Sequence, residues 1–118
     1  MDKKILTIYQ KPTCSKCRDL LRTLRERQIG YESVNYYEQQ FDAVGLKKLL
    51  KQLKMRPLDL MRTKEGLYKK LNLAAGNKTD DELVDLMVAH PDLIQRPIVV
   101  KGNKAVLARP LENVDNIM

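Results

Sequence analysis

The chain is poor in several residue types that mark particular classes of protein. Its 118 residues include two cysteines, one histidine, one phenylalanine and no tryptophan. A structural zinc site takes four ligands, nearly all Cys or His, so Cys14, Cys17 and His90 are too few without a carboxylate or a second chain. The shortage of aromatic residues argues against a base-stacking surface, and no basic stripe interleaved with aromatics is present. We expect neither a metal site nor direct binding of nucleic acid.

Long apolar runs are also missing. No stretch approaches the roughly 18 apolar residues of a membrane span, and the first residues lack the apolar region of a signal peptide. We therefore expect a cytoplasmic protein without membrane association, and in that compartment a cysteine pair is more often catalytic or metal-binding than structural. The net charge of +7 favours an anionic partner, whether nucleic acid, an acidic protein or a small oxyanion.

The order of the expected elements predicts the class of fold. A chain of this length should form one domain over residues 1–118. Strand, helix and strand come first, a helical insertion at about 40–90 follows, and a hairpin and a short helix end the chain. This βαβ and ββα order predicts a thioredoxin-like α/β fold with a mixed four-stranded sheet and flanking helices. The strands are expected at 4–10, 31–36, 98–100 and 105–108, around a Gly102-Asn103 turn.

Apolar spacing and capping residues place the helices. Apolar side chains at i, i+3, i+4 and i+7 over 17–24 predict a helix, with Gly30 as its stop. A second apolar stripe over 46–53 should be broken at Arg56-Pro57, because proline restricts the residue before it. The remaining boundaries are a capping box at Thr79 and Glu82, an end at His90-Pro91, and a terminal helix from Pro110 to about Ile117.

The stretch KPTCSKC holds both cysteines. A disulfide across two residues would stabilise little, because loop-closure entropy scales with loop length. A cysteine at a strand-to-helix junction faces the unsatisfied N–H groups of the helix, which stabilise the thiolate. Lys11, Lys16 and Arg18 add positive charge nearby. We predict that Cys14, at the helix N-cap, is a redox-active nucleophile, and that Cys17 is either a resolving thiol or part of the apolar stripe.

Three arginines are candidates for holding a substrate anion. The guanidinium group is planar and always charged, and it binds oxyanions with two hydrogen bonds. Arg96 precedes Pro97 and an apolar strand, and Arg109 leaves the other strand of the same hairpin before Pro110. Arg62 lies in LDLMRTKEG. In a chain with 22 Lys and Arg, spacing alone makes this a weak signal.

Four segments resemble the small arsenate reductases of the ArsC type in the thioredoxin-like superfamily. They are IYQKPTCSKCR, LMRTKEGLYKKLNL, TDDELVDLMVAHPDLIQRPIVV and VLARP, which span nearly the whole chain in the family's order. The resemblance implies arsenate reduction, with a role in arsenic detoxification. It also implies that Cys14 is the nucleophile, that Arg62, Arg96 and Arg109 bind the oxyanion, and that a cis bond before Pro97 faces the cysteine loop.

The chain departs from the family pattern at two positions. Many members have a thiol-activating His where this chain has Gln10, and glutaredoxin-coupled members have a single active-site Cys where this chain adds Cys17. The second departure resembles the Spx-type thiol-sensing regulators, which carry CxxC and bind RNA polymerase. Arg109-Pro110 resembles the reductases instead, so the reductase is the first hypothesis and the regulator is the alternative.

The resemblance also implies how the reaction is completed. After Cys14 attacks arsenate, a second thiol resolves the adduct and arsenite is released. If Cys17 is that thiol, a Cys14–Cys17 disulfide forms and thioredoxin or glutaredoxin reduces it. If glutathione is that thiol, Cys17 is packing. Neither route needs a metal or a bound cofactor, and we expect a monomer.

Overall fold

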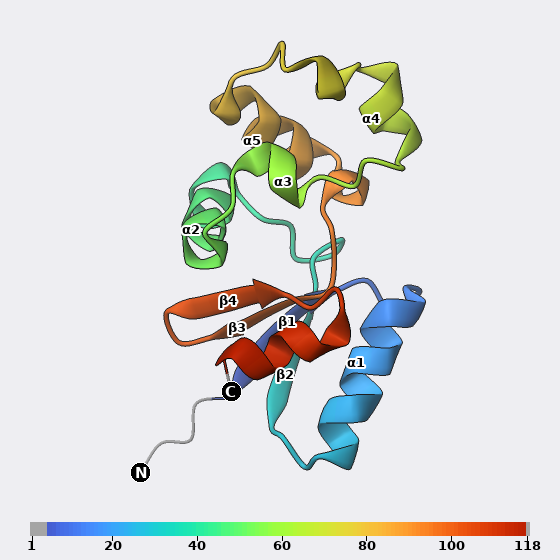
Figure 1. The fold of residues 1–118 in the computed structure, drawn as a ribbon, viewed down its shortest axis with the longest axis vertical. Coiled ribbons are helices and arrows are strands. Elements are labelled where there is room, and N and C mark those ends of the chain that lie inside the picture. The colour runs from blue at the N-terminus through green and yellow to red at the C-terminus, as the bar shows by residue number, and fades with distance from the viewer. Residues whose placement is uncertain (1–4, 118) are drawn as a thin grey trace. The chain divides into compact units, whose positions relative to one another are not determined.

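The computed structural model describes residues 5–117, which form two compact units (Figure 1). The sheet unit comprises residues 5–39 and 96–117, and the helical unit comprises residues 40–95. The predicted insertion at about 40–90 thus falls on the helical unit, while folding of the whole chain as one domain stays a prediction. Lys4, which the sequence assigns to the first strand, lies outside the described residues.

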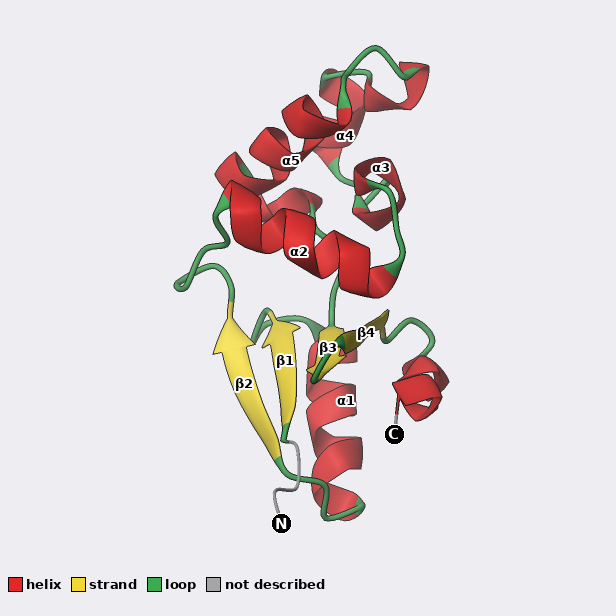
Figure 2. Ribbon diagram, turned by 90° about the vertical axis from the view of Figure 1, so that its left-hand side faces the viewer, coloured by secondary structure: helices red, strands yellow, loops and turns green. Residues whose placement is uncertain are grey.

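The sheet unit is built on four strands in the order β2-β1-β3-β4 (Figure 2). The strands are β1 (Leu6–Gln10), β2 (Tyr31–Asn35), β3 (Ile98–Lys101) and β4 (Lys104–Leu107). β1 runs parallel to β2, with Ile8 opposite Ser33, and antiparallel to β3, with Ile8 opposite Val99. β3 and β4 form the predicted hairpin. The mixed four-stranded sheet expected from the sequence is therefore confirmed.

One face of this sheet carries the core of the unit. Alternate residues of β1 are buried, as the two-residue period of a strand requires. α1 (Ser15–Glu26) and the terminal 3₁₀ helix η3 (Leu111–Ile117) contribute apolar side chains to the same cluster. Fully burying one leucine stabilises the fold by about 1.5–3 kcal/mol. The buried residues of this cluster are Leu6, Ile8, Leu20, Leu24, Val99, Ala108, Val114 and Ile117.

The end of α1 differs from the prediction. The helix ends at Glu26, and Gln28 rather than Gly30 adopts the left-handed conformation, with φ of 59°. The backbone N–H of Gln28 donates to Arg25, and that of Ile29 donates to Leu24. This pair of bonds is a Schellman motif, which accepts a non-glycine residue here. The apolar contact of Ile29 with the core favours ending the helix there.

The helical unit contains six short elements. They are α2 (Ala43–Leu53), α3 (Pro57–Leu60), α4 (Gly66–Lys70), η1 (Leu73–Ala75), α5 (Asp80–Ala89) and η2 (Pro91–Leu93). The capping box of α5 is confirmed, since the N–H of Thr79 donates to Glu82 and the N–H of Glu82 donates back to Thr79. None of the helices within residues 5–117 is long and apolar enough to cross a membrane.

The prediction that Pro57 interrupts a helix is wrong. α2 has already ended at Leu53, and Lys54 is its left-handed C-cap, with φ of 58°. Pro57 is instead the first residue of α3. Proline suits that position because the N–H it lacks would have no partner inside the helix.

Candidate active site

Cys14 lies at the junction between strand β1 and helix α1. β1 ends at Gln10, and the N–H of Cys14 donates to the Lys11 carbonyl, which closes a tight turn. Cys14 is the N-cap of α1, with an extended backbone (φ −81°, ψ 123°). Its side chain is half-buried and forms no capping hydrogen bond of ordinary length. The sulfur therefore lies beside the free N–H groups of the first turn and remains reachable from solvent.

The surroundings of Cys14 stabilise its thiolate. Burial alone would raise the pKa of Cys14, but the N–H groups of Cys17 and Lys16, the Cys17 thiol and the Arg96 guanidinium outweigh it and lower that pKa to about 7. About half of the thiol is then ionised at neutral pH. The sequence pointed to the side chains of Lys11, Lys16 and Arg18 as the nearby cations, whereas the arginine that acts on the sulfur is Arg96.

Cys17 has the opposite environment. It lies one turn into α1 on the side that faces the core, and its exposed fraction is 0%. Burial, the main cause, and the neighbouring Cys14 raise the pKa of Cys17 to about 12, although the N–H of Lys11 partly opposes this. Both thiols are free. At neutral pH Cys14 is thus about half ionised, whereas Cys17 remains a thiol.

Arg96 and Arg109 meet in the sheet unit. Arg96 lies two residues before β3 and is only 5% exposed, whereas Arg109 follows β4 and is exposed. The Nε of Arg109 donates to the Arg96 carbonyl oxygen at 2.6 Å. The peptide bonds before Pro97 and Pro110 are both cis, the first as the resemblance implies. The structure thus brings Cys14, Cys17, Arg96 and Arg109 together in one unit.

Arg62 lies in the helical unit, just after α3. Its Nη1 is 3.2 Å from Oε2 of Glu65, and both side chains are half-buried. The same Nη1 donates to the Asp92 carbonyl at 3.4 Å, and the backbone N–H of Arg62 donates to Leu93 at 2.7 Å. Sequence reasoning missed Glu65, although a spacing of three residues between opposite charges is a recognisable signal for an ion pair.

Gln10 stands where the resemblance implies a thiol-activating histidine. The residue is 6% exposed, and its Nε2 donates to Oγ of Ser33 on the neighbouring strand at 2.8 Å. Its Oε1 is buried and finds no hydrogen-bond partner within the described residues. The amide therefore links β1 to β2, and it cannot exchange a proton with Cys14 as a histidine would.

Two tyrosines that the sequence reasoning overlooked lie at the site. The hydroxyls of Tyr36 and Tyr37 each accept a hydrogen bond from Nη1 of Arg96, at 3.3 Å in both cases. Nζ of Lys11 lies 4.8 Å from the centre of the Tyr37 ring. Adjacent tyrosines directly after a strand are the sequence signal, in a chain with only five tyrosines.

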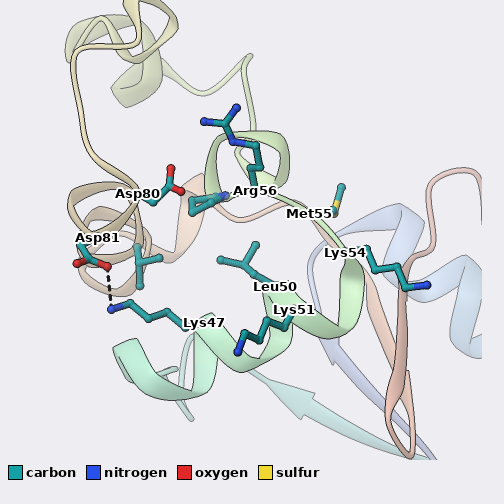
Figure 3. Close-up of a pocket in the computed structure, with 10 residues that line it drawn as sticks. Lys47, Leu50, Lys51, Lys54, Met55, Arg56, Asp80 and Asp81 are labelled. Carbon is teal, nitrogen blue, oxygen red and sulfur yellow. Dashed lines mark ion pairs between the residues drawn. The ribbon is translucent and has the colours of Figure 1, made fainter.

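A separate pocket of about 580 Å³ opens on the surface of the helical unit (Figure 3). Leu50, Met55, Pro57 and Val84 supply its apolar lining. Its charged side chains have both signs, and Lys47 is paired with Asp81 at 2.8 Å. The pocket contains neither cysteine and none of the three candidate arginines, so we do not assign it to the active site. Within residues 5–117 no group of three His, Cys, Asp or Glu is placed to hold a metal ion.

The fold and the site define a class of protein. A mixed sheet with a cysteine between β1 and α1, and a cis-proline before β3, is the arrangement of thioredoxin-like thiol proteins. Residues 9–117 match the ArsC family. The chain therefore belongs to the ArsC family, as its sequence motifs indicate.

Individual relatives agree with this assignment. The chain is 45% identical to a protein of Escherichia coli K12 called "Uncharacterized protein YfgD", over 98% of each chain. It is 38% identical to an arsenate reductase of Neisseria meningitidis, over 96% of this chain and 97% of that one. The structure of an arsenate reductase from Vibrio cholerae matches with a TM-score of 0.92 at 39% identity, over 99% of this chain and 100% of that one. The predicted thioredoxin-like architecture is thus confirmed.

Proposed function

We propose that this chain is a thiol-dependent arsenate reductase. The observation that carries the proposal is a cysteine whose pKa is lowered to about 7 beside a buried arginine, in a chain with relatives named arsenate reductase. A thiolate next to a guanidinium suits the attack of sulfur on an oxyanion, because the arginine holds the anion that the sulfur attacks.

Arg96 and Arg109 are the proposed anion-binding residues of the sheet unit. Arg109 uses its Nε for the Arg96 carbonyl, which leaves its terminal N–H groups for the substrate. Guanidinium groups neutralise the charge of arsenate and the further charge that builds as sulfur approaches arsenic. The participation of Arg62 in binding the same anion stays a prediction of the family resemblance.

The first chemical step forms a bond from Cys14 to arsenic. The thiolate attacks As(V), and one oxygen of arsenate leaves as hydroxide or, once protonated, as water. A second thiol then attacks the Cys14 sulfur. The sulfur–arsenic bond breaks with its electron pair on arsenic, a disulfide forms, and As(V) becomes As(III). The two electrons come from the two thiols, so the step balances without a further reductant.

The second thiol is Cys17 or an external thiol such as glutathione. Cys17 interacts directly with Cys14, which favours the internal route. The negative charge of Cys14 helps to keep Cys17 protonated, and this charge disappears once sulfur binds arsenic. The burial of Cys17 persists and favours the external route. Thioredoxin or a glutathione and glutaredoxin system would restore the reduced enzyme, in the cytoplasm.

Arsenate turnover tests the proposal with two reductant systems. The wild type, Cys14→Ser and Cys17→Ser are each assayed with thioredoxin and with glutathione plus glutaredoxin. Cys14→Ser should abolish turnover in both systems, because a hydroxyl is far less acidic than a thiol. Cys17→Ser should lose turnover only if the internal route operates. Absence of turnover by the wild type with both systems would overturn the proposed function.

A further inference from the structure

Arg96 needs partners because it is almost completely buried. Arginine is rarely buried unless its N–H groups are satisfied, and an unpaired buried charge is costly. Nη1 of Arg96 donates to the hydroxyls of Tyr36 and Tyr37, which lie 60 and 59 residues away in sequence. The contact therefore depends on the folded sheet unit and not on local chain geometry.

The two phenols are themselves held in place. Tyr36 is fully buried, and its ring centre lies 5.1 Å from that of Tyr37, with the planes tilted by 39°. The Tyr37 ring also contacts two cations, since Nζ of Lys11 lies 4.8 Å and Cζ of Arg96 lies 5.9 Å from its centre. Such contacts restrict the freedom of both rings. The hydroxyls thus present a fixed pair of acceptors to Arg96.

We propose that Tyr36 and Tyr37 are positioning residues that hold the Arg96 guanidinium against the Cys14 sulfur. The inference rests on the proposed function for its effect on substrate, whereas its effect on the thiol rests on the hydrogen bonds of the two phenols to Arg96 and on the interaction of Arg96 with Cys14. Without the two acceptors the guanidinium would turn toward other partners or toward water. Cys14 would then lose a group that stabilises its thiolate, and arsenate would lose a fixed binding group.

Phenols suit this task better than carboxylates. At neutral pH a phenol accepts a hydrogen bond without bringing a negative charge, so it orients the guanidinium and leaves its positive charge available to the sulfur. Burial alone would lower the pKa of Arg96, but the contacts with Tyr36, Tyr37 and Cys14 outweigh it and raise that pKa. The site therefore keeps a charged arginine in a buried position.

The test measures Cys14 directly and needs no arsenate. The alkylation rate of Cys14 by iodoacetamide is followed by peptide mass spectrometry from pH 5 to 9, in the full chain carrying Tyr36→Phe, Tyr37→Phe or both. Each phenylalanine keeps the ring and removes the acceptor. The matched control is Tyr31→Phe, which removes a phenol that accepts from Arg25 at 3.4 Å on the exposed surface.

We expect the double variant to react with iodoacetamide roughly threefold to tenfold more slowly at pH 6, with the midpoint of its pH profile moved upward. Tyr31→Phe should leave the profile unchanged. The KM for arsenate should rise in the double variant.

If Tyr36→Phe fails to fold, Tyr37→Phe carries the test, because Tyr37 is only half-buried. Its pH profile should then show a smaller shift in the same direction. A profile that overlays the wild type in folded Tyr37→Phe and in the folded double variant would overturn the inference. A wild type with a low midpoint and no arsenate turnover would overturn the proposed function alone.

Discussion

Arg96 and Arg62 show how differently the two units use the same side chain. Arg96, in the sheet unit, is buried and donates to two neutral phenols. Arg62, in the helical unit, is half-buried and donates to the carboxylate of Glu65. A carboxylate offsets the charge of its arginine, whereas a phenol orients the arginine without offsetting it. The strength of an arginine as an anion-binding group is therefore set by its partners as well as by its position.

Removing the charge of Arg96 or Arg62 should give the largest effect, a loss of kcat/KM for arsenate. We predict that Arg96→Gln lowers kcat/KM for arsenate by roughly a thousandfold, as removal of one strong transition-state donor typically does. Arg62→Gln, the matched variant, should lower it by about tenfold, because Glu65 already offsets much of that charge. Initial-rate kinetics measure both values. Equal losses of kcat/KM would contradict the view that the hydrogen-bond partners of an arginine set its strength as an anion-binding group.

Core truncation compares the stability of the two units. Leu20 in the sheet unit and Leu73 in the helical unit are both almost fully buried. Each change to alanine should lower the free energy of unfolding by about 3 kcal/mol, through lost burial and the cavity left behind. If the chain is one domain, as its length predicts, both variants shift a single urea transition followed by circular dichroism. Two separate transitions, each sensitive to one variant, would contradict the single-domain prediction.

The reactivity of Cys14 should depend on pH near neutrality. Because its pKa is lowered to about 7, the thiolate fraction is nearly complete above pH 8 and falls about tenfold for each unit below pH 6. The iodoacetamide rate should follow this curve, while Cys17 should stay unmodified across the range because it is buried. The groups acting on Cys14 are Cys17, Lys16 and Arg96. A midpoint near 9 would show that these groups do not stabilise the thiolate.

Signals between neighbouring residues in the sequence predicted the local features of the fold better than those that depend on long-range contacts. The capping box of Thr79 and Glu82 and the hairpin turn at Gly102-Asn103 each involve residues within a few positions, and both are confirmed. The sequence predicts the end of α1 at the nearest glycine, Gly30. The helix instead ends before Gln28, which takes the left-handed conformation, because Ile29 packs against a core that exists only in the folded chain.

The features of the candidate site also separate into those that local sequence predicts and those that depend on long-range contacts. The position of Cys14 at the N-cap follows from the strand and helix that flank it. The bonds from Arg96 to Tyr36 and Tyr37 join residues 60 and 59 positions apart. The sequence places the two tyrosines side by side after a strand, but it does not indicate that Arg96 binds them. The ion pair of Arg62 with Glu65 spans only three residues, so its spacing is a local signal that the sequence contains.

Substitutions at helix caps should give the smallest effect, a change of about 1 kcal/mol or less in the free energy of unfolding. The caps also differ between the two units. In the helical unit Asp42 accepts a hydrogen bond from the N–H of Gly45, and Thr79 accepts one from Glu82. In the sheet unit the N-cap of α1 is Cys14, which makes no such bond. The proposed nucleophile takes this position, so we expect the sheet unit to lack the stability that an oxygen cap would add.

Substitution at each cap separates stability from reactivity. We predict that Thr79→Ala lowers the free energy of unfolding by about 1 kcal/mol, and that Cys14→Ser raises it by about 0.5 kcal/mol while abolishing turnover. Urea unfolding at pH 6 measures both, since the wild-type thiol is then largely protonated and its charge contributes little. A destabilised Cys14→Ser would mean that the sulfur itself stabilises the start of α1, and that the reactive cysteine costs the fold nothing.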